Sequence, residues 1–132
     1  MTQGVLVDSD VLIDFSRRSQ QAINWLGQLE GEYRIAVSDI SRMELMVGAR
    51  NKMELAVIES SLKRFVSISL SESISRLAVE LIQQYRLSHG LLIPDALIAA
   101  SALSWSIPLA TKNQRDFRFI EKLRLVEWNT AP

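Results

Sequence analysis

Apolar positions along the chain alternate between short, strand-like runs and longer helical repeats. Runs of four to six mostly aliphatic residues bounded by turn formers predict buried strands. They lie at residues 4–9, 33–38, 66–70, 108–111 and 125–128. Between them, apolar residues recur at helical spacing. This pattern predicts helices at residues 10–18, 20–29, 40–49, 53–65, 71–89, 95–105 and 116–123.

Glycine and proline define the expected helix ends. Gly31 is expected to stop the second helix, Gly48 lies near the end of the third, and Gly90 follows the long helix 71–89. Pro94 occupies the first position of the next helix, where its missing N–H costs nothing. That helix, DALIAASALSW, is apolar on nearly every side, so we expect it to be central.

Strands that alternate with helices predict an α/β sandwich with a mainly parallel sheet. A length of 132 residues suits one domain, residues 1–132. In such folds, ligands bind beyond the carboxyl ends of the strands. Asp8, residues 38–44 and residues 111–116 all lie just past predicted strand ends.

Composition narrows the classes of protein. Lys+Arg and Asp+Glu both number 15, so a nucleic-acid partner would need basic residues gathered on one face. The chain has no cysteine, which excludes disulfides and thiolate zinc sites and fits a reducing cytosol. We recognise no secretory leader and no membrane span, so we expect a cytoplasmic protein. The single histidine, His89, is interpreted as a residue at a helix end.

Four acidic residues each have a purely structural explanation. Asp8 can cap the helix that follows it, a contact worth about 1 kcal/mol. Glu44 completes the capping-box pattern SRME, which begins at Ser41. Asp95 lies in a first helical turn, where a carboxylate interacts favourably with the helix dipole. Asp116 can cap the predicted helix that follows it.

The surroundings of these acids also permit a shared metal site. Asp8 ends an apolar strand and Asp95 begins the most apolar helix, with no basic residue next to either in sequence. Two carboxylates about 5 Å apart repel by roughly 3 kcal/mol at an effective dielectric near 20, so several converging acids need raised pKa values or a cation. Oxygen ligands alone suit Mg²⁺ or Mn²⁺. Such an ion lowers the pKa of bound water and neutralises phosphate charge, as phosphodiester hydrolysis requires.

Four segments together resemble the PIN domain, and within it the VapC-type toxins of VapBC toxin–antitoxin pairs. The segments are VLVDSDVLID, ISRMELMVGA, IPDALIAASA and LATKNQRDF, and they span essentially the whole chain. The resemblance implies a PIN-like three-layer α/β/α sandwich with a mainly parallel sheet of four to five strands. It also implies a Mg²⁺- or Mn²⁺-dependent endoribonuclease, the toxin of a type II system, that hydrolyses RNA with a metal-activated water.

The resemblance assigns roles to the acids and implies partners. Asp8, Glu44 and Asp95 are the expected metal-binding and catalytic residues. Asp116 is the expected fourth ligand, with Asn113 assisting. The implied partners are an RNA substrate, with tRNA a common target of relatives, a VapB-like antitoxin, and a second copy of the chain.

Further residues are expected to support this site. Ser9 and Thr111 are expected to orient ligands or water. Asp10 stands where the family usually has Asn, and is expected either to bind metal through water or to cap the first helix. Three basic residues are candidate contacts to RNA phosphates, with solvated surface as the alternative for each: Lys112, Arg115 and Arg42.

Two other functions compete with this interpretation. VLVDSDVLI also resembles the opening motif of haloacid-dehalogenase-like phosphatases, in which Asp8 would be the nucleophile and Asp10 the general acid. The later acidic pair of that family is missing, and the chain is short for its fold. The second alternative is a catalytically dead PIN-fold module that binds RNA or protein. The intact set of acids argues against it.

Overall fold

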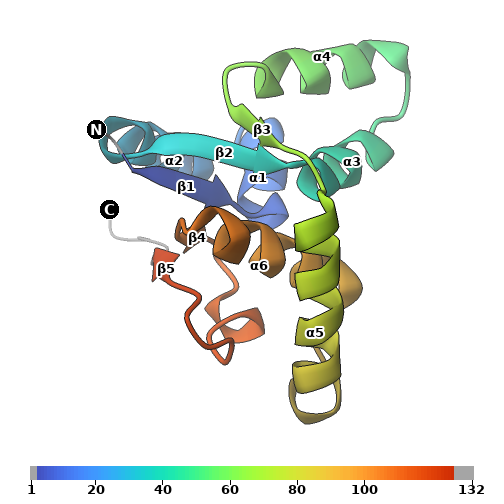
Figure 1. Ribbon diagram of the computed structural model, residues 1–132. Helices are drawn as coiled ribbons and strands as arrows, with labels where there is room; N and C mark the ends of the chain where they lie inside the picture. The colour runs from blue at the N-terminus through green and yellow to red at the C-terminus, as the bar shows by residue number, and fades with distance from the viewer. Residues whose placement is uncertain (1–2, 127–132) are drawn as a thin grey trace.

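A parallel β-sheet forms the centre of the computed structural model, which describes residues 3–126 (Figure 1). The sheet has five strands in the order β3-β2-β1-β4-β5, and every neighbouring pair is parallel. The strands are β1 (Gly4–Val7), β2 (Arg34–Ser38), β3 (Val66–Ile68), β4 (Leu109–Ala110) and β5 (Leu125–Val126). All five predicted strands are therefore present, the first four in shortened form. Residues 127–128 of the predicted last strand lie outside the described residues.

Helices connect the strands, as parallel pairing requires. They are α1 (Ser9–Ser16), α2 (Gln20–Glu32), α3 (Asp39–Val47), α4 (Lys52–Leu62), α5 (Glu72–His89) and α6 (Ile93–Trp105), followed by a 3₁₀ turn, η1 (Gln114–Asp116). The first three connections each contain a pair of helices in contact with each other: α1 with α2, α3 with α4, and α5 with α6.

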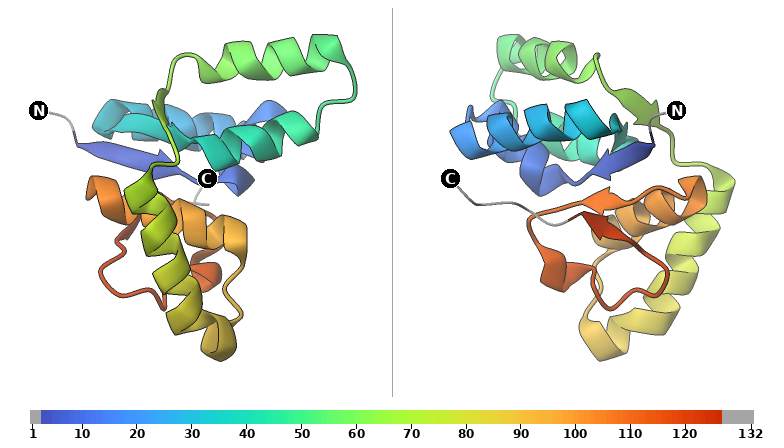
Figure 2. Two further views of the ribbon diagram at one scale, coloured as in Figure 1. Left: turned by 45° about the vertical axis from the view of Figure 1, so that its right-hand side comes forward. Right: turned by 90° about the vertical axis from the view of Figure 1, so that its left-hand side faces the viewer.

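The helices lie on both faces of the sheet and give the molecule three layers (Figure 2). Successive residues of β1 point to opposite faces. Leu6 joins the core beneath α5 and α6, whereas Val5 and Val7 join the core shared with α1 and α2. The predicted three-layer α/β/α sandwich is confirmed.

Helix α6 is central, as its sequence predicts. Its buried side chains lie on several sides of the helix: Ala96, Ile98, Ala99, Ala100, Ser101 and Ala102. Most of them are alanine, which lets the backbone of α6 pack closely against both the sheet and α5. The helix begins with Pro94 in its first turn. Asp95 therefore lies in the first turn of a helix that is held firmly in the core.

One predicted helix end is wrong. Gly31 does not stop α2, which continues to Glu32. The helix ends one residue later because Tyr33 takes up extended backbone and enters β2. A helical glycine costs only about 1 kcal/mol, so the packing of Trp25, Leu26 and Leu29 into the core outweighs it.

The predicted helix over residues 116–123 is also absent. Only a 3₁₀ turn forms, and Asp116 lies at its end, so this residue does not cap a helix. The chain continues in tight turns, with the N–H of Ile120 donating to the carbonyl oxygen of Phe117 at 3.0 Å. Phe117 is fully buried and Ile120 nearly so, and these turns bring both side chains into the core beside α5 and α6.

The longest helix, α5, shows how sequence pattern and capping act together. Its predicted apolar stripe is confirmed, with Ile74, Leu81 and Tyr85 buried. It ends at Gly90, whose φ of +71° lies in the left-handed region that strains any residue with a Cβ. No helix among residues 3–126 has the length and apolar character needed to cross a membrane.

We therefore expect opposite effects from alanine at two glycines. Gly90→Ala should lower the free energy of unfolding by about 1 kcal/mol, because alanine is strained at positive φ. Gly27→Ala, in the middle of α2 with open space around the new Cβ, should raise it by up to about 1 kcal/mol. Urea denaturation of both variants measures the difference. A stabilising Gly90→Ala would contradict the left-handed cap.

Candidate metal centre

The carboxyl ends of the three central strands form one edge, and the candidate site lies there. Val7 of β1 pairs in register with Ala110 of β4, and the Asp8 N–H donates to the Ala110 carbonyl oxygen at 2.9 Å. This register places Asp8 beside Thr111. Ser38 ends β2 on the other side of β1. Residues more than 100 positions apart are thus brought side by side.

Asp8 is both a helix cap and a buried acid. Its Oδ1 accepts from the Ser9 N–H at 2.7 Å at the start of α1, so the capping interpretation holds. Its Oδ2 accepts from the Thr111 hydroxyl at 2.8 Å. Burial nevertheless raises the pKa of Asp8 to about 7, and the nearby Asp10 charge adds to the effect. Two hydrogen bonds do not offset the loss of water.

Asp10 occupies the first turn of α1 and links it to the segment after β4. Its Oδ2 accepts from the Lys112 N–H at 3.1 Å and lies 3.3 Å from the Thr111 hydroxyl. Burial raises the pKa of Asp10, while the charge of Lys112 opposes this. The N-cap residue is Asp8, and Asp10 contributes to the first turn of α1 by accepting from the Val11 N–H at 2.7 Å. Its water-mediated metal role stays a prediction.

Glu44 does not close a capping box. The residue that caps α3 is Ser38, whose hydroxyl accepts from the Ser41 N–H at 3.2 Å. Ser41 is therefore inside the helix, and Glu44 lies in the next turn. One of its oxygens accepts from the Ser9 hydroxyl at 2.6 Å. This contact joins α3 to α1 at the candidate site.

Asp95 carries the strongest sign of an incomplete site. It is half-buried, and its carboxylate makes no hydrogen bond or ion pair with any residue from 3 to 126. Burial and, in decreasing order, the charges of Asp116, Glu44 and Asp10 together raise the pKa of Asp95 to about 6. Asp116 itself is exposed at the end of η1. All four predicted ligands, together with Asp10, thus act on one another electrostatically.

The donor set fits a hard divalent cation. It consists of carboxylate oxygens with two hydroxyls. The raised pKa values of Asp8 and Asp95 reflect burial first and neighbouring acidic charge second, and a bound dication would offset both effects. Within residues 3–126 no three acidic or histidine side chains already converge as a coordination shell. Closing such a shell therefore requires side-chain rotation, which exposed Asp116 can make most freely.

The supporting residues occupy different places around this cluster. Thr111 is fully buried and orients Asp8, as expected. Asn113 contributes its N–H to the Thr111 hydroxyl at 3.0 Å, while its side chain is exposed. Arg115 is exposed on η1, and Arg42 forms a partly exposed ion pair with Asp39 at 3.1 Å. Contact of these two arginines with RNA stays a prediction.

Sequence reasoning missed Asp14. Its carboxylate forms an ion pair with Lys112 Nζ, which holds the lysine across α1. Asp14 lies four residues after Asp10, so both acids face the same side of α1. That spacing was available in the sequence and is the signal that could have found it. The role of Lys112 in binding RNA stays a prediction.

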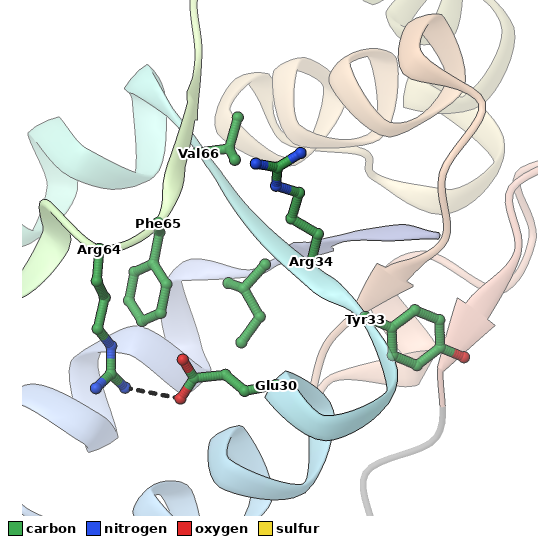
Figure 3. A pocket seen from close by; sticks show the side chains of 7 residues that line it. Glu30, Tyr33, Arg34, Arg64, Phe65 and Val66 are labelled. Carbon is green, nitrogen blue, oxygen red and sulfur yellow. Dashed lines mark hydrogen bonds and ion pairs between the residues drawn. The ribbon is translucent and has the colours of Figure 1, made fainter. Parts of the chain in front are cut away.

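A hollow of 260 Å³ lies at the other end of the sheet from the candidate site, where β2 and β3 begin (Figure 3). Arg64 donates to Glu30 at 3.1 Å there, and its guanidinium lies 4.8 Å from the ring centre of Phe65. Arg34 points away from this pair (Figure 3). The ion pair between Arg64 and Glu30 links α2 to the loop before β3.

Comparison with known proteins identifies the family. The PIN domain family matches residues 5–123. The chain belongs to the PIN domain family. A similar relative is ribonuclease VapC10 of Mycobacterium tuberculosis (strain ATCC 25618 / H37Rv), 36% identical over 121 residues, which are 91% of this chain and 90% of that protein. The phosphatase alternative rests on the first strand alone and is not supported.

Chains in solved toxin–antitoxin and VapBC structures share the fold. A toxin–antitoxin complex from Klebsiella pneumoniae contains a chain with a TM-score of 0.75 and 32% identity, covering 90% of this chain and 94% of that one. VapBC2 from Rickettsia felis, bound to a DNA fragment of its promoter, gives a TM-score of 0.80 and 25% identity, covering 96% of this chain and all (100%) of that one.

The raised pKa of Asp8 predicts that the metal-free protein loses stability as pH rises. An acid whose pKa is 3.8 when unfolded and about 7 when folded retains its proton preferentially in the folded state. Stability should therefore fall between about pH 4 and pH 7, by up to about 4 kcal/mol from this group. Urea midpoints in EDTA across this range measure the loss.

Asp8→Asn should flatten this dependence and stabilise the metal-free protein near pH 8, because asparagine still caps a helix but carries no charge. Glu59→Gln, at an exposed position on α4, is the control and should keep the wild-type slope. Equal destabilisation of Asp8→Asn at every pH would mean that the cap dominates.

Proposed function

We propose that this PIN-domain protein is a metal-dependent endoribonuclease that acts as the toxin of a type II toxin–antitoxin pair. The observation that supports the proposal is that Asp8, Glu44 and Asp116 lie near enough to Asp95 for their charges to interact with it, with raised pKa values at Asp8 and Asp95. The name of the relative ribonuclease VapC10 supports the same activity. A toxin acting on cellular RNA would work in the cytoplasm.

In this proposal the four acids hold Mg²⁺ or Mn²⁺. When bound, such an ion activates water and stabilises negative charge on a phosphate. Asp8 is the fixed ligand, since Thr111 and the start of α1 hold both of its oxygens. Glu44 is oriented by Ser9, and Asp95 offers a carboxylate with no competing partner among residues 3–126. Asp116, at the exposed end of η1, completes the set, and Asn113 lies just before this turn.

RNA phosphates would be held by basic side chains beside the acids. Arg115 precedes Asp116 directly, and Lys112 follows Thr111, so both lie on the segment that borders the site. Arg42 lies two residues before Glu44 on α3. The zero net charge of the chain means that this local arrangement, not overall charge, would attract the substrate. Transfer RNA is one candidate substrate.

A VapB-like antitoxin is the proposed inhibitory partner. Helices α1, α3 and α4 enclose a groove of 640 Å³, and Glu44 forms part of its wall. Figure 1 shows α4 as an outlying helix, and its groove-lining residues Met53 and Val57 are 78% and 62% exposed. A partner segment with an apolar face would cover these side chains and block access to Glu44 at once.

A homodimer is the second proposed assembly. A separate apolar groove of 380 Å³ lies between α5 and α6. Figure 2 shows these two helices on the opposite side of the molecule from α4. Val79 and Ile93 line it and are 55% and 70% exposed. Exposed apolar residues grouped in this way are typical of a surface covered by another protein. Ile93 is two residues from Asp95, so a dimer here would bring the two acid clusters towards one another.

The proposed activity predicts the outcome of an assay on a mixed RNA pool. Wild-type protein with Mg²⁺ should cut RNA, and EDTA should stop it. Asp95→Asn should reduce the rate more than about 100-fold, because it removes a metal ligand. Glu32→Gln, an exposed acid on α2, should keep wild-type activity. Arg115→Ala should raise KM with little change in kcat if this arginine binds phosphate.

RNA binding by the wild type without any metal-dependent cleavage would instead favour the catalytically dead binding module. Loss of cleavage in Glu32→Gln to the same degree as in Asp95→Asn would show that the assay reports general charge and not the acid site.

Two variants distinguish the proposed antitoxin-binding groove from the proposed dimer groove. Val57→Asp should weaken the complex with the cognate antitoxin at least about tenfold and leave the mass of the isolated protein unchanged, because a charge cannot enter the α4 groove without a partner. Val79→Asp should do the reverse and yield monomers. Both side chains are exposed, so each variant should fold. Light scattering of the protein alone and with the antitoxin measures both. Identical behaviour of the two variants would refute this assignment.

A further inference from the structure

A row of buried serine hydroxyls leads from the end of β2 to the carboxylate of Glu44. Ser38 and Ser41 are fully buried and Ser9 is 7% exposed. The Ser38 and Ser41 oxygens are 3.3 Å apart, and the Ser41 and Ser9 oxygens are 2.9 Å apart. Ser9 Oγ then lies 2.6 Å from Glu44 Oε1. The row crosses from α3 to α1 and back to the acid site.

The row has a direction because each hydroxyl carries one proton. Ser9 lies within donating distance of both Ser41 and Glu44. A carboxylate is the stronger acceptor and its contact is the shorter, so Ser9 donates to Glu44. Ser9 therefore accepts from Ser41, and Ser41 accepts from Ser38. Hydroxyls that all donate in one direction polarise one another and strengthen the last bond.

This direction gives Ser41 a specific task. Glu44 is half-buried on a side chain with several rotatable bonds, and holding it in one orientation costs conformational entropy. Ser9 can hold it only while its own hydroxyl stays turned towards Glu44. The bond from Ser41 fixes that orientation, because it occupies the acceptor side of Ser9.

We infer that Ser41 is a positioning residue, which acts through Ser9 to hold the Glu44 carboxylate at the acid cluster. The inference rests on the proposed function only in taking Glu44 as a metal ligand. The competing explanation is that Ser41 merely fills space inside α3. The two explanations differ because space filling does not reach Glu44, whereas positioning changes how the site takes up a cation.

Mn²⁺ affinity of the purified protein, measured by titration, tests this. Ser41→Ala and Ser41→Cys should each bind Mn²⁺ about tenfold more weakly, since alanine has no donor and a thiol is a weak one that fills the same space. Ser101→Ala is the matched control. Ser101 is also fully buried, and its hydroxyl donates to the Leu97 carbonyl oxygen at 2.8 Å within α6. The Mn²⁺ affinity of the Ser101→Ala variant should equal that of the wild type.

Wild-type Mn²⁺ affinity in Ser41→Ala overturns the inference. So does a loss seen in Ser41→Ala but absent from Ser41→Cys, because that pattern reports a cavity. Wild-type protein that binds Mn²⁺ yet never cleaves RNA would refute the proposed activity while leaving the positioning role to be decided by these affinities.

A thermodynamic cycle in metal-free protein supplies a readout that needs no cation. Ser41→Ala and Glu44→Gln should be non-additive in their urea midpoints, and Ser9→Ala should abolish the coupling because it removes the link. Additive effects overturn the inference, including in the case that wild-type protein binds no Mn²⁺.

Discussion

The burial of the Asp8 carboxylate at the end of the central strand is the constraint on which the site depends. β1 lies between β2 and β4, so the residue that follows it is enclosed on both sides. Such a place suits an apolar side chain, and an acid there is costly unless it is paired. The surrounding polar groups are best understood as a response to this one unfavourable position.

The response is incomplete in a way that indicates function. Thr111 and the first turn of α1 satisfy the two oxygens of Asp8, yet its pKa remains raised to about 7. Asp95 is a second acid whose pKa is raised, to about 6. The ion pair of Lys112 is with Asp14. A protein selected for stability alone would gain by replacing these acids. Their retention fits a site that is completed by a cation.

Hydroxyl groups connect the acids to the scaffold without adding charge. The serine row positions Glu44 from one side and Thr111 positions Asp8 from the other. Basic side chains in the same places would neutralise the acids and compete with a metal ion. Serine and threonine can orient a carboxylate while leaving its negative charge available, which is the property a metal ligand needs.

Periodicity along the chain determined the elements of the fold. Every strand was predictable because its apolar run is short and bounded by turn residues, and α5 and α6 were predictable from a stripe and from all-round apolarity. The failures share one cause. Gly31 and the segment after Asp116 adopt the structure that buries Trp25 or Phe117 best, and local propensity does not include that packing.

The sequence by itself determined which acids are candidate ligands, since the resemblance of four segments to the PIN domain points to Asp8, Glu44, Asp95 and Asp116. Only the tertiary structure decided how those acids are held. The links from Ser41 through Ser9 to Glu44, and from Thr111 to Asp8, join residues that are between 32 and 103 positions apart. Their geometry follows from strand register and helix packing, because contacts between distant segments exist only once the sheet has brought the strand ends together.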